Sequence, residues 1–71
     1  MTRNLEMKIT VNGKEEQLDA TLSIAAYLEK KGVQGNAVVE RNFVIVKRGT
    51  YSEVELQDGD QLEVVQMMAG G

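Results

Sequence analysis

Residues 22–32, LSIAAYLEKKG, form the segment of this 71-residue chain that has helical periodicity. Its apolar residues recur at intervals of three and four, and those that share one face are Leu22, Ile24, Ala25 and Leu28. Thr21 is a good N-cap, and Gly32 is the expected C-terminal stop. A helix with one apolar face must pack that face against another layer, so the rest of the chain has to supply a sheet.

The segment before this helix predicts a β-hairpin. Residues 7–12, MKITVN, alternate between apolar and polar side chains, as a half-buried strand does. Asn12-Gly13 follows, which is the strongest short hairpin signal. Residues 14–18, KEEQL, then return as a second strand.

The segment after the helix is again β-rich. The strands expected there are residues 37–42, 43–48, 53–56 and 61–68. A turn at Asn42 separates the first two, and the Asp-Gly-Asp turn of residues 58–60 precedes the last.

This order of elements predicts an α+β fold, with a mixed sheet of four or five strands and one main helix packed on one face. The expected core residues are Ile9, Val11, Leu18, Leu22, Ala25, Leu28, Val39, Val46, Leu56, Leu62 and Val64. We expect residues 7–67 to form the domain, residues 1–6 to be a disordered extension and residues 68–71 to be a flexible tail.

The composition argues against several classes of function. The chain has no Cys and no His, so it lacks thiolate nucleophiles, the usual general base near neutral pH and the ligands of most zinc sites. The close acidic pairs, Glu15-Glu16 and Asp58 with Asp60, are typical of surfaces and turns. A net charge of −3 argues against binding nucleic acid or anionic membrane. We therefore expect a cytoplasmic, monomeric protein that is not an enzyme and binds no metal or cofactor itself.

Five stretches carry a resemblance to a known family. They are ITVNG at 9–13, TLSIAAYL at 21–28, VVERNFVIVKR at 38–48, LQDGDQLEVV at 56–65 and AGG at 69–71. Over residues 7–71 the chain resembles the ThiS family of thiamine-biosynthesis sulfur carriers, which have the β-grasp, or ubiquitin-like, fold. The family has a small turn residue, often Gly, where this chain has Phe43, so the shape of that turn does not follow from the resemblance.

The resemblance implies a chemical role for the Gly-Gly end of the sequence. The Gly71 carboxylate would be adenylated by a partner enzyme and converted into a thiocarboxylate that donates sulfur. Ala69 and Gly70 would thread into the partner's channel, since glycine lacks Cβ and allows close backbone approach. These three residues span only about 10 Å when extended, so the body of the domain must dock near the reacting centre.

The resemblance also implies the partners. They are a ThiF-type adenylyltransferase that uses ATP and Mg²⁺, a ThiG-type thiazole synthase that accepts the sulfur, and a persulfide sulfur donor. The first and last strands would lie side by side and parallel. Val65 and Met67 would then face away from the helix and, with Val38, form the docking surface.

Three alternative functions fit the same sequence. The first is the MoaD-like small subunit of molybdopterin synthase, which has the same terminal chemistry and a different acceptor. The second is a ubiquitin-like modifier, in which Gly71 would form an isopeptide bond with lysines. The third is an interaction module whose C-terminal residues have no chemical role. The sequence does not decide between a thiazole and a pterin as the acceptor.

Overall fold

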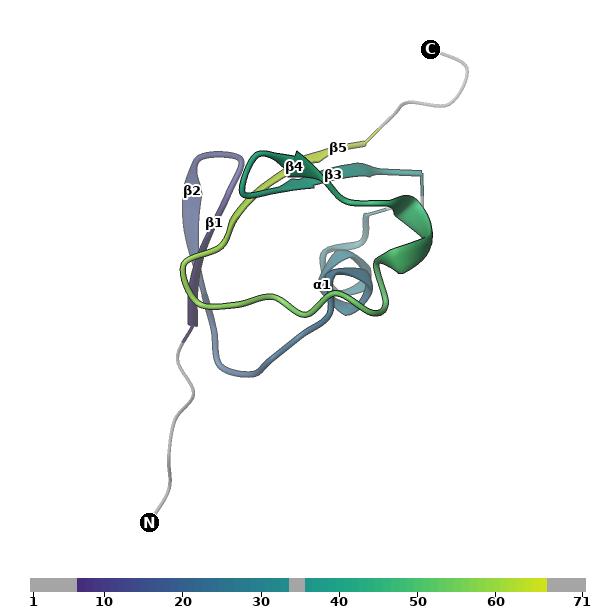
Figure 1. Cartoon of the computed structure of the whole chain (residues 1–71). Helices are drawn as coiled ribbons and strands as arrows, with labels where there is room; N and C mark the ends of the chain where they lie inside the picture. Colours follow the sequence, from purple (N-terminus) through teal and green to yellow (C-terminus); the bar gives the residue numbers. More distant parts are fainter. Residues whose placement is uncertain (1–6, 34–35, 67–71) are drawn as a thin grey trace.

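The computed structural model describes residues 7–33 and 36–66, which form a five-stranded sheet with one α-helix beneath it (Figure 1). The elements are β1 (Met7–Val11), β2 (Lys14–Leu18), α1 (Ile24–Lys31), β3 (Val38–Arg41), β4 (Val44–Ile45), the 3-10 helix η1 (Arg48–Thr50) and β5 (Gln61–Val65). The predicted α+β class and mixed sheet are confirmed. The predicted extension at 1–6 and tail at 68–71 lie outside the described residues.

The sheet places β5 at its centre, in the order β2-β1-β5-β3-β4. β1 and β5 run parallel, with Thr10 opposite Gln61 and Val11 opposite Leu62. The other three pairs of neighbouring strands are antiparallel. The predicted parallel contact between the first and last strands is therefore confirmed, and β5 is held by a neighbour on each side.

The hairpin between β1 and β2 forms where Asn12-Gly13 predicts it. Both residues have positive φ, 52° at Asn12 and 84° at Gly13. Two left-handed residues in succession match the twist of a tight hairpin, and Asn and Gly tolerate that conformation best. The register that results places Val11 opposite Lys14.

The helix begins later than the sequence predicts. Its N-cap is Ser23 and not Thr21, because the Ser23 Oγ accepts a hydrogen bond from the Ala26 N–H at 3.0 Å. Leu22 lies before the helix, and its carbonyl accepts from the Leu56 N–H at 2.8 Å. The predicted stop is confirmed, since Gly32 has a φ of 75° and its N–H donates to the Glu29 carbonyl.

The core lies between α1 and the sheet. Six of the predicted core residues are buried, namely Ile9, Leu18, Leu28, Val39, Leu56 and Leu62. The other five are partly buried and pack against them, namely Val11, Leu22, Ala25, Val46 and Val64. The prediction omitted four buried hydrophobic residues, Ile24, Tyr27, Ala37 and Tyr51. Both tyrosines are buried because each hydroxyl reaches an acceptor, the Glu16 carboxylate for Tyr27 and the Ala37 carbonyl for Tyr51.

The strand predicted at residues 53–56 is not present. The 3-10 helix and the turn after it shorten this segment, and the N–H groups of Glu53 and Val54 both donate to the Thr50 carbonyl. Only Glu55 forms a β-bridge, and its partner is Ser23 at the start of the helix. The backbone of this segment is therefore paired with the lead into α1 and not with the sheet.

The turn between β3 and β4 contains a strained residue. Asn42 and Phe43 both have positive φ, 53° and 71°, and an L-residue other than Gly rarely adopts this conformation unless it is Asn or Asp. The side chain of Phe43 is 80% exposed, so little burial offsets the strain. The resemblance to the ThiS family did not predict the shape of this turn. In the structure Phe43 adopts a left-handed conformation that Gly would adopt at a lower cost in free energy.

Replacing Phe43 with Gly should therefore stabilise the domain. The left-handed conformation costs an L-residue about 1–2 kcal/mol, and the greater freedom of glycine in the unfolded chain cancels part of that gain. We expect the free energy of unfolding to rise by about 1 kcal/mol in denaturant titrations. Val44→Gly, at the exposed neighbouring position in β4, should lower it instead. Equal losses in the two variants would show that Phe43 is not strained.

Candidate functional site

The side chains of β5 alternate between the two faces of the sheet, as its sequence predicts. Leu62 is 2% exposed and Val64 is partly buried, and both pack in the core against α1. Gln61, Glu63 and Val65 are exposed, and Val65 is 56% exposed. The predicted register is confirmed, because a slip of one residue would exchange these two sets.

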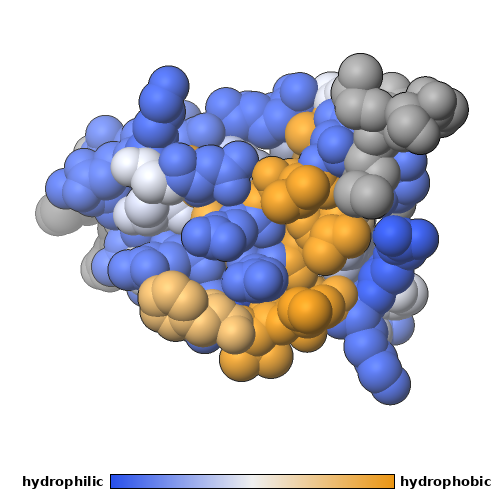
Figure 2. Space-filling model, turned by 90° about the horizontal axis from the view of Figure 1, so that it is seen from above, coloured by the Kyte–Doolittle hydropathy of each residue, from blue (hydrophilic) through white to orange (hydrophobic). Residues whose placement is uncertain are grey.

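An apolar patch lies on the open face of the sheet, the face opposite α1. Val38 is directly opposite Val65, and Ile45 is opposite Glu40 one step further along β3. Phe43 lies on the same face, where it lines a small pocket together with Glu40 and Glu63. We define the open-face patch as Val38, Phe43, Ile45 and Val65. Figure 2 views the molecule from the sheet side and shows hydrophobic side chains gathered on this face.

Only part of this patch was predicted from the sequence. Val38 and Val65 were predicted and lie opposite each other. Phe43 and Ile45 were missed, although Ile45 is 67% exposed. The signal that could have found them is the alternation along residues 43–48, because an inward Val46 places Phe43 and Ile45 on the opposite face of a strand. Met67, Ala69, Gly70 and Gly71 lie outside the described residues.

Two acidic side chains interrupt the patch. Glu40 on β3 is directly opposite Glu63 on β5, and both point to the open face between the Val38–Val65 pair and the turn. Like charges in direct opposition destabilise a sheet, so this pair lowers the stability of the free domain. The open face thus combines apolar groups with an acidic centre, which suits a partner that offers apolar contacts and a basic side chain.

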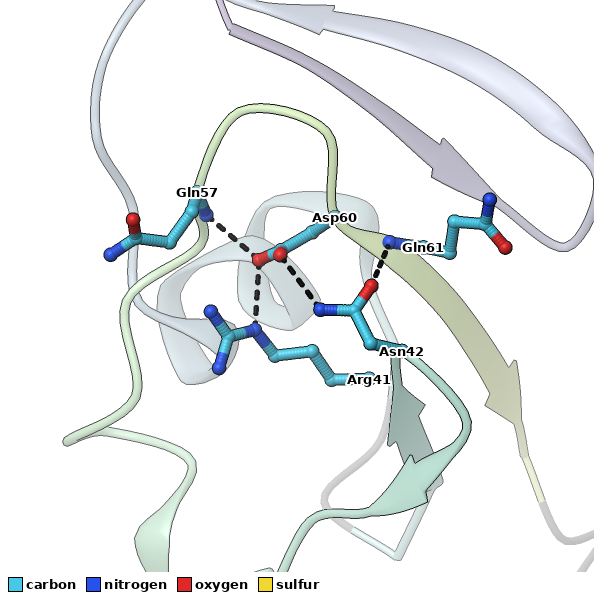
Figure 3. A network of polar contacts seen from close by, with 5 residues as sticks. All are labelled: Arg41, Asn42, Gln57, Asp60 and Gln61. Carbon is cyan, nitrogen blue, oxygen red and sulfur yellow. Dashed lines mark hydrogen bonds and ion pairs between the residues drawn. The ribbon is translucent and has the colours of Figure 1, made fainter.

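A polar network holds the other end of β5 (Figure 3). Asp60 is buried, and its Oδ2 accepts from the Arg41 Nε and the Gln57 N–H, both at 2.8 Å. Its Oδ1 accepts from the Asn42 Nδ2 at 3.1 Å, and the Asn42 Oδ1 accepts from the Gln61 N–H at 2.9 Å. The network ties the loop before β5 to the end of β3. The acidic turn is therefore structural, as predicted, although the burial of Asp60 was not foreseen.

The Asp60 carboxyl is charged in spite of its burial. Burial by itself raises the pKa of this carboxyl, but the hydrogen bonds from Arg41, Gln57 and Asn42 outweigh it and leave the pKa below its ordinary value. With three donors supplied by the protein and a side chain that is only 5% exposed, Asp60 is committed to the network and is not placed to receive a substrate. We therefore assign it to stability and not to catalysis.

A second polar cluster lies on the helix side of the sheet. The Tyr27 hydroxyl donates to the Glu16 Oε1 at 2.8 Å, and the Lys31 Nζ lies 3.3 Å from the Glu16 Oε2. Burial raises the pKa of the Tyr27 hydroxyl, and the bond to Glu16 raises it further. These groups join α1 to β2 and are paired with one another.

The described residues include no group of three or more acidic side chains placed to hold a metal ion. Within the same part of the chain, no helix has the length and apolarity needed to cross a membrane.

The arrangement of the described elements defines the class of the protein. A mixed sheet with a parallel central pair, crossed on one face by one helix, is the β-grasp or ubiquitin-like domain. The model of the ThiS family matches residues 5–71, and the chain belongs to that family.

Solved structures agree with this assignment. The chain is similar to the crystal structure of the thiamine biosynthesis protein ThiS from Geobacter metallireducens, with 30% identity and a TM-score of 0.76. That alignment covers 92% of this chain and 100% of the other. A solution structure of a thiamine biosynthesis protein from the same organism gives a TM-score of 0.75 and is covered to 88%.

Two curated relatives are longer proteins named thiazole synthase. The one from Paramagnetospirillum magneticum is 41% identical over 66 residues, and the one from Magnetococcus marinus is 42% identical over 66 residues. Each match covers 92% of this chain, which spans only 20% of the length of either relative.

Proposed function

We propose that this chain is a sulfur carrier for the formation of thiazole in thiamine biosynthesis, and that it is not itself an enzyme. The observation that carries the proposal is the match to the ThiS family over residues 5–71, which includes the Gly70-Gly71 end of the sequence. The fold contributes a central strand, β5, which is the last strand of the described residues before that end of the sequence.

The chemistry we propose takes place at the Gly71 carboxylate. A carboxylate resists nucleophiles, so ATP first converts it into an acyl-adenylate with release of pyrophosphate. A persulfide sulfur then displaces AMP and forms an acyl disulfide. A thiolate then attacks the donor's sulfur in this S–S bond. The thiocarboxylate is left on Gly71, and the attacking sulfur and the donor's sulfur are joined as a disulfide. The thiocarboxylate finally passes its sulfur to the acceptor.

The proposed partners supply the ATP-binding site, the sulfur and the acceptor of the sulfur. A ThiF-type adenylyltransferase would bind the ATP and Mg²⁺, and a persulfide-bearing protein would supply the sulfur. A ThiG-type thiazole synthase would accept it, and this choice is supported by the two relatives that carry that name. We place the reaction in the cytoplasm, where ATP is available.

The open-face patch is the docking surface we propose for these partners. Val65 is the last residue of β5, so any partner that receives Gly71 must contact the body of the domain close to it. Phe43 keeps a strained conformation while exposed, and strain of this kind is often retained for a function. Met67 would extend the patch, because its flexible side chain suits a surface that meets two partners.

The substitution Val65→Asp should weaken binding to the activating enzyme by about 2 kcal/mol, as the loss of an interface anchor can. It places a third carboxylate beside Glu40 and Glu63 on the face where we expect apolar contact. The melting temperature should change little, because Val65 is exposed.

Val44→Asp is the matched control for this substitution. Val44 is 66% exposed but is opposite Arg41, on the other side of the sheet from Val65. Calorimetric titration should show normal affinity for it. Unchanged affinity of Val65→Asp would rule out the patch, and a collapse in its melting temperature would show that Val65 supports the fold.

Release of pyrophosphate tests the proposed function directly. The chain with ATP and Mg²⁺ alone should release no pyrophosphate, whereas addition of the adenylyltransferase should give pyrophosphate and an acyl-adenylate on Gly71. Pyrophosphate released by the isolated chain would contradict the assignment as a carrier that is not an enzyme. A lack of pyrophosphate with the partner present would contradict the carrier chemistry.

A further inference from the structure

Asn12 does more than form the hairpin turn. It directly follows β1, where the chain leaves the parallel pair with β5, and its backbone N–H donates to the Leu62 carbonyl at 2.9 Å. Its side chain then continues the ladder. The Asn12 Oδ1 accepts from the Val64 N–H at 2.9 Å, and the Asn12 Nδ2 donates to the Val64 carbonyl at 3.2 Å.

The carboxamide of Asn12 thus replaces the peptide group that β1 would have offered had it continued. A carboxamide has one carbonyl acceptor and N–H donors, as the backbone has. The turn alone does not require this side chain, because Gly is equally suited to the positive φ at this position. The contact with Val64 is therefore a property of Asn12 that the hairpin signal does not explain.

Asn42 makes the equivalent contact at the opposite end of β5. Its backbone N–H donates to the Gln61 carbonyl at 2.7 Å, and its Oδ1 accepts from the Gln61 N–H at 2.9 Å. It also lies in a hairpin turn with a positive φ, 53° against 52° for Asn12. Two turn asparagines therefore hold β5, Asn42 where the strand begins and Asn12 where it ends.

We propose that Asn12 is a positioning residue that fixes the direction in which β5 delivers Gly71 to the active site of the activating enzyme. Beyond Val11, the Asn12 side chain bonds to the edge of β5 that faces β1. The other edge of β5 is paired with β3, where Val38 is opposite Val65. Without the carboxamide, the end of β5 is paired on one side only and can pivot about β3. This inference rests on the proposed function.

Three variants separate positioning from folding. Asn12→Gly keeps a residue suited to the turn and removes both bonds to Val64. Asn12→Asp keeps an acceptor for the Val64 N–H but loses the donor. Asn42→Gly is the matched control, because it makes the same change in the other turn and also removes the contact with Asp60. Hydrogen exchange should show about tenfold faster exchange of the Val64 amide in Asn12→Gly than in the unaltered chain, because its acceptor is lost.

The kinetic test measures ATP–pyrophosphate exchange by the activating enzyme as the concentration of each carrier is varied. For Asn12→Gly we expect kcat to fall about three- to tenfold with KM nearly unchanged, because docking is intact and the carboxylate is in place less often. Asn12→Asp should lie between this variant and the unaltered chain. Asn42→Gly should keep a normal kcat even though it loses more stability.

The outcomes distinguish the inference from the function on which it rests. A normal kcat for Asn12→Gly beside an active unaltered chain would overturn the positioning role and leave the carrier function in place. An equal loss of kcat in Asn42→Gly would also overturn it, since the effect would then follow stability. No ATP–pyrophosphate exchange with the unaltered chain would contradict the proposed function and this inference together.

Discussion

Gly70→Val is expected to abolish adenylation of Gly71 by the activating enzyme while the melting temperature stays nearly unchanged. The added Cβ and its two methyl groups widen the chain next to the reacting carboxylate and restrict its φ and ψ. Deletion of Gly71 should have the same effect, because it withdraws the carboxylate from the reacting centre. Pyrophosphate release beside thermal melts measures both properties.

Gly49→Val is the matched control for this prediction. Gly49 lies in the 3-10 helix, away from β5, and a Cβ built there meets no atom within 4 Å. This variant should be adenylated at the normal rate. Normal adenylation of Gly70→Val would refute the argument that the end of the chain threads through a narrow channel.

Asp60→Asn should lower the free energy of unfolding by about 2 kcal/mol, which is about 10 °C in melting temperature for a domain of this size. Both carboxylate oxygens of Asp60 accept hydrogen bonds, one from Asn42 and the other from Arg41 and Gln57. Whichever position the new NH₂ group takes, a donor then faces a donor.

The same variant should change how stability depends on pH. Because the native pKa of Asp60 lies below its ordinary value of 3.8, its contribution is present above that pH and is lost as the pH falls through the native pKa. Denaturant titrations below about pH 4 should therefore show a shallower loss in Asp60→Asn than in the unaltered chain. Asp19→Asn, at an exposed carboxylate, should match the unaltered chain. Equal acid dependence in all three would contradict the role of the network.

The parts of the fold that the sequence predicts are those set by local chemistry. Asn12-Gly13 predicts its hairpin because few residues adopt two positive φ angles in succession. The alternation along β5 predicts which side chains are buried, since a strand has a period of two. Leu62 and Val65 lie on the faces that were expected for this reason.

The errors occur where tertiary contacts decide between local alternatives. Thr21 and Ser23 are both good N-caps, and the pairing of Leu22 with Leu56 selects Ser23. Residues 53–56 have a strand pattern, but the 3-10 helix before them keeps them out of the sheet. The burial of Asp60 depends on Arg41 and Asn42, which are distant in sequence, so no local pattern shows it.

The candidate site also has features that local sequence predicts and features that only tertiary contacts determine. The sequence predicts the chemistry at Gly71 and the outward direction of Val65, and the structure confirms the second of these. The two hydrogen bonds between Asn12 and Val64 span 52 positions in sequence and could be seen only once the sheet was assembled.

Mass spectrometry of the protein isolated from its own cells tests the central claim most directly. The account predicts a C-terminal peptide in which one carboxylate oxygen of Gly71 is replaced by sulfur. This form should disappear in Gly70→Val and persist in Gly49→Val. A Gly71 that is found only as an unmodified carboxylate, or joined through an isopeptide bond to lysines of other proteins, would contradict the sulfur-carrier function.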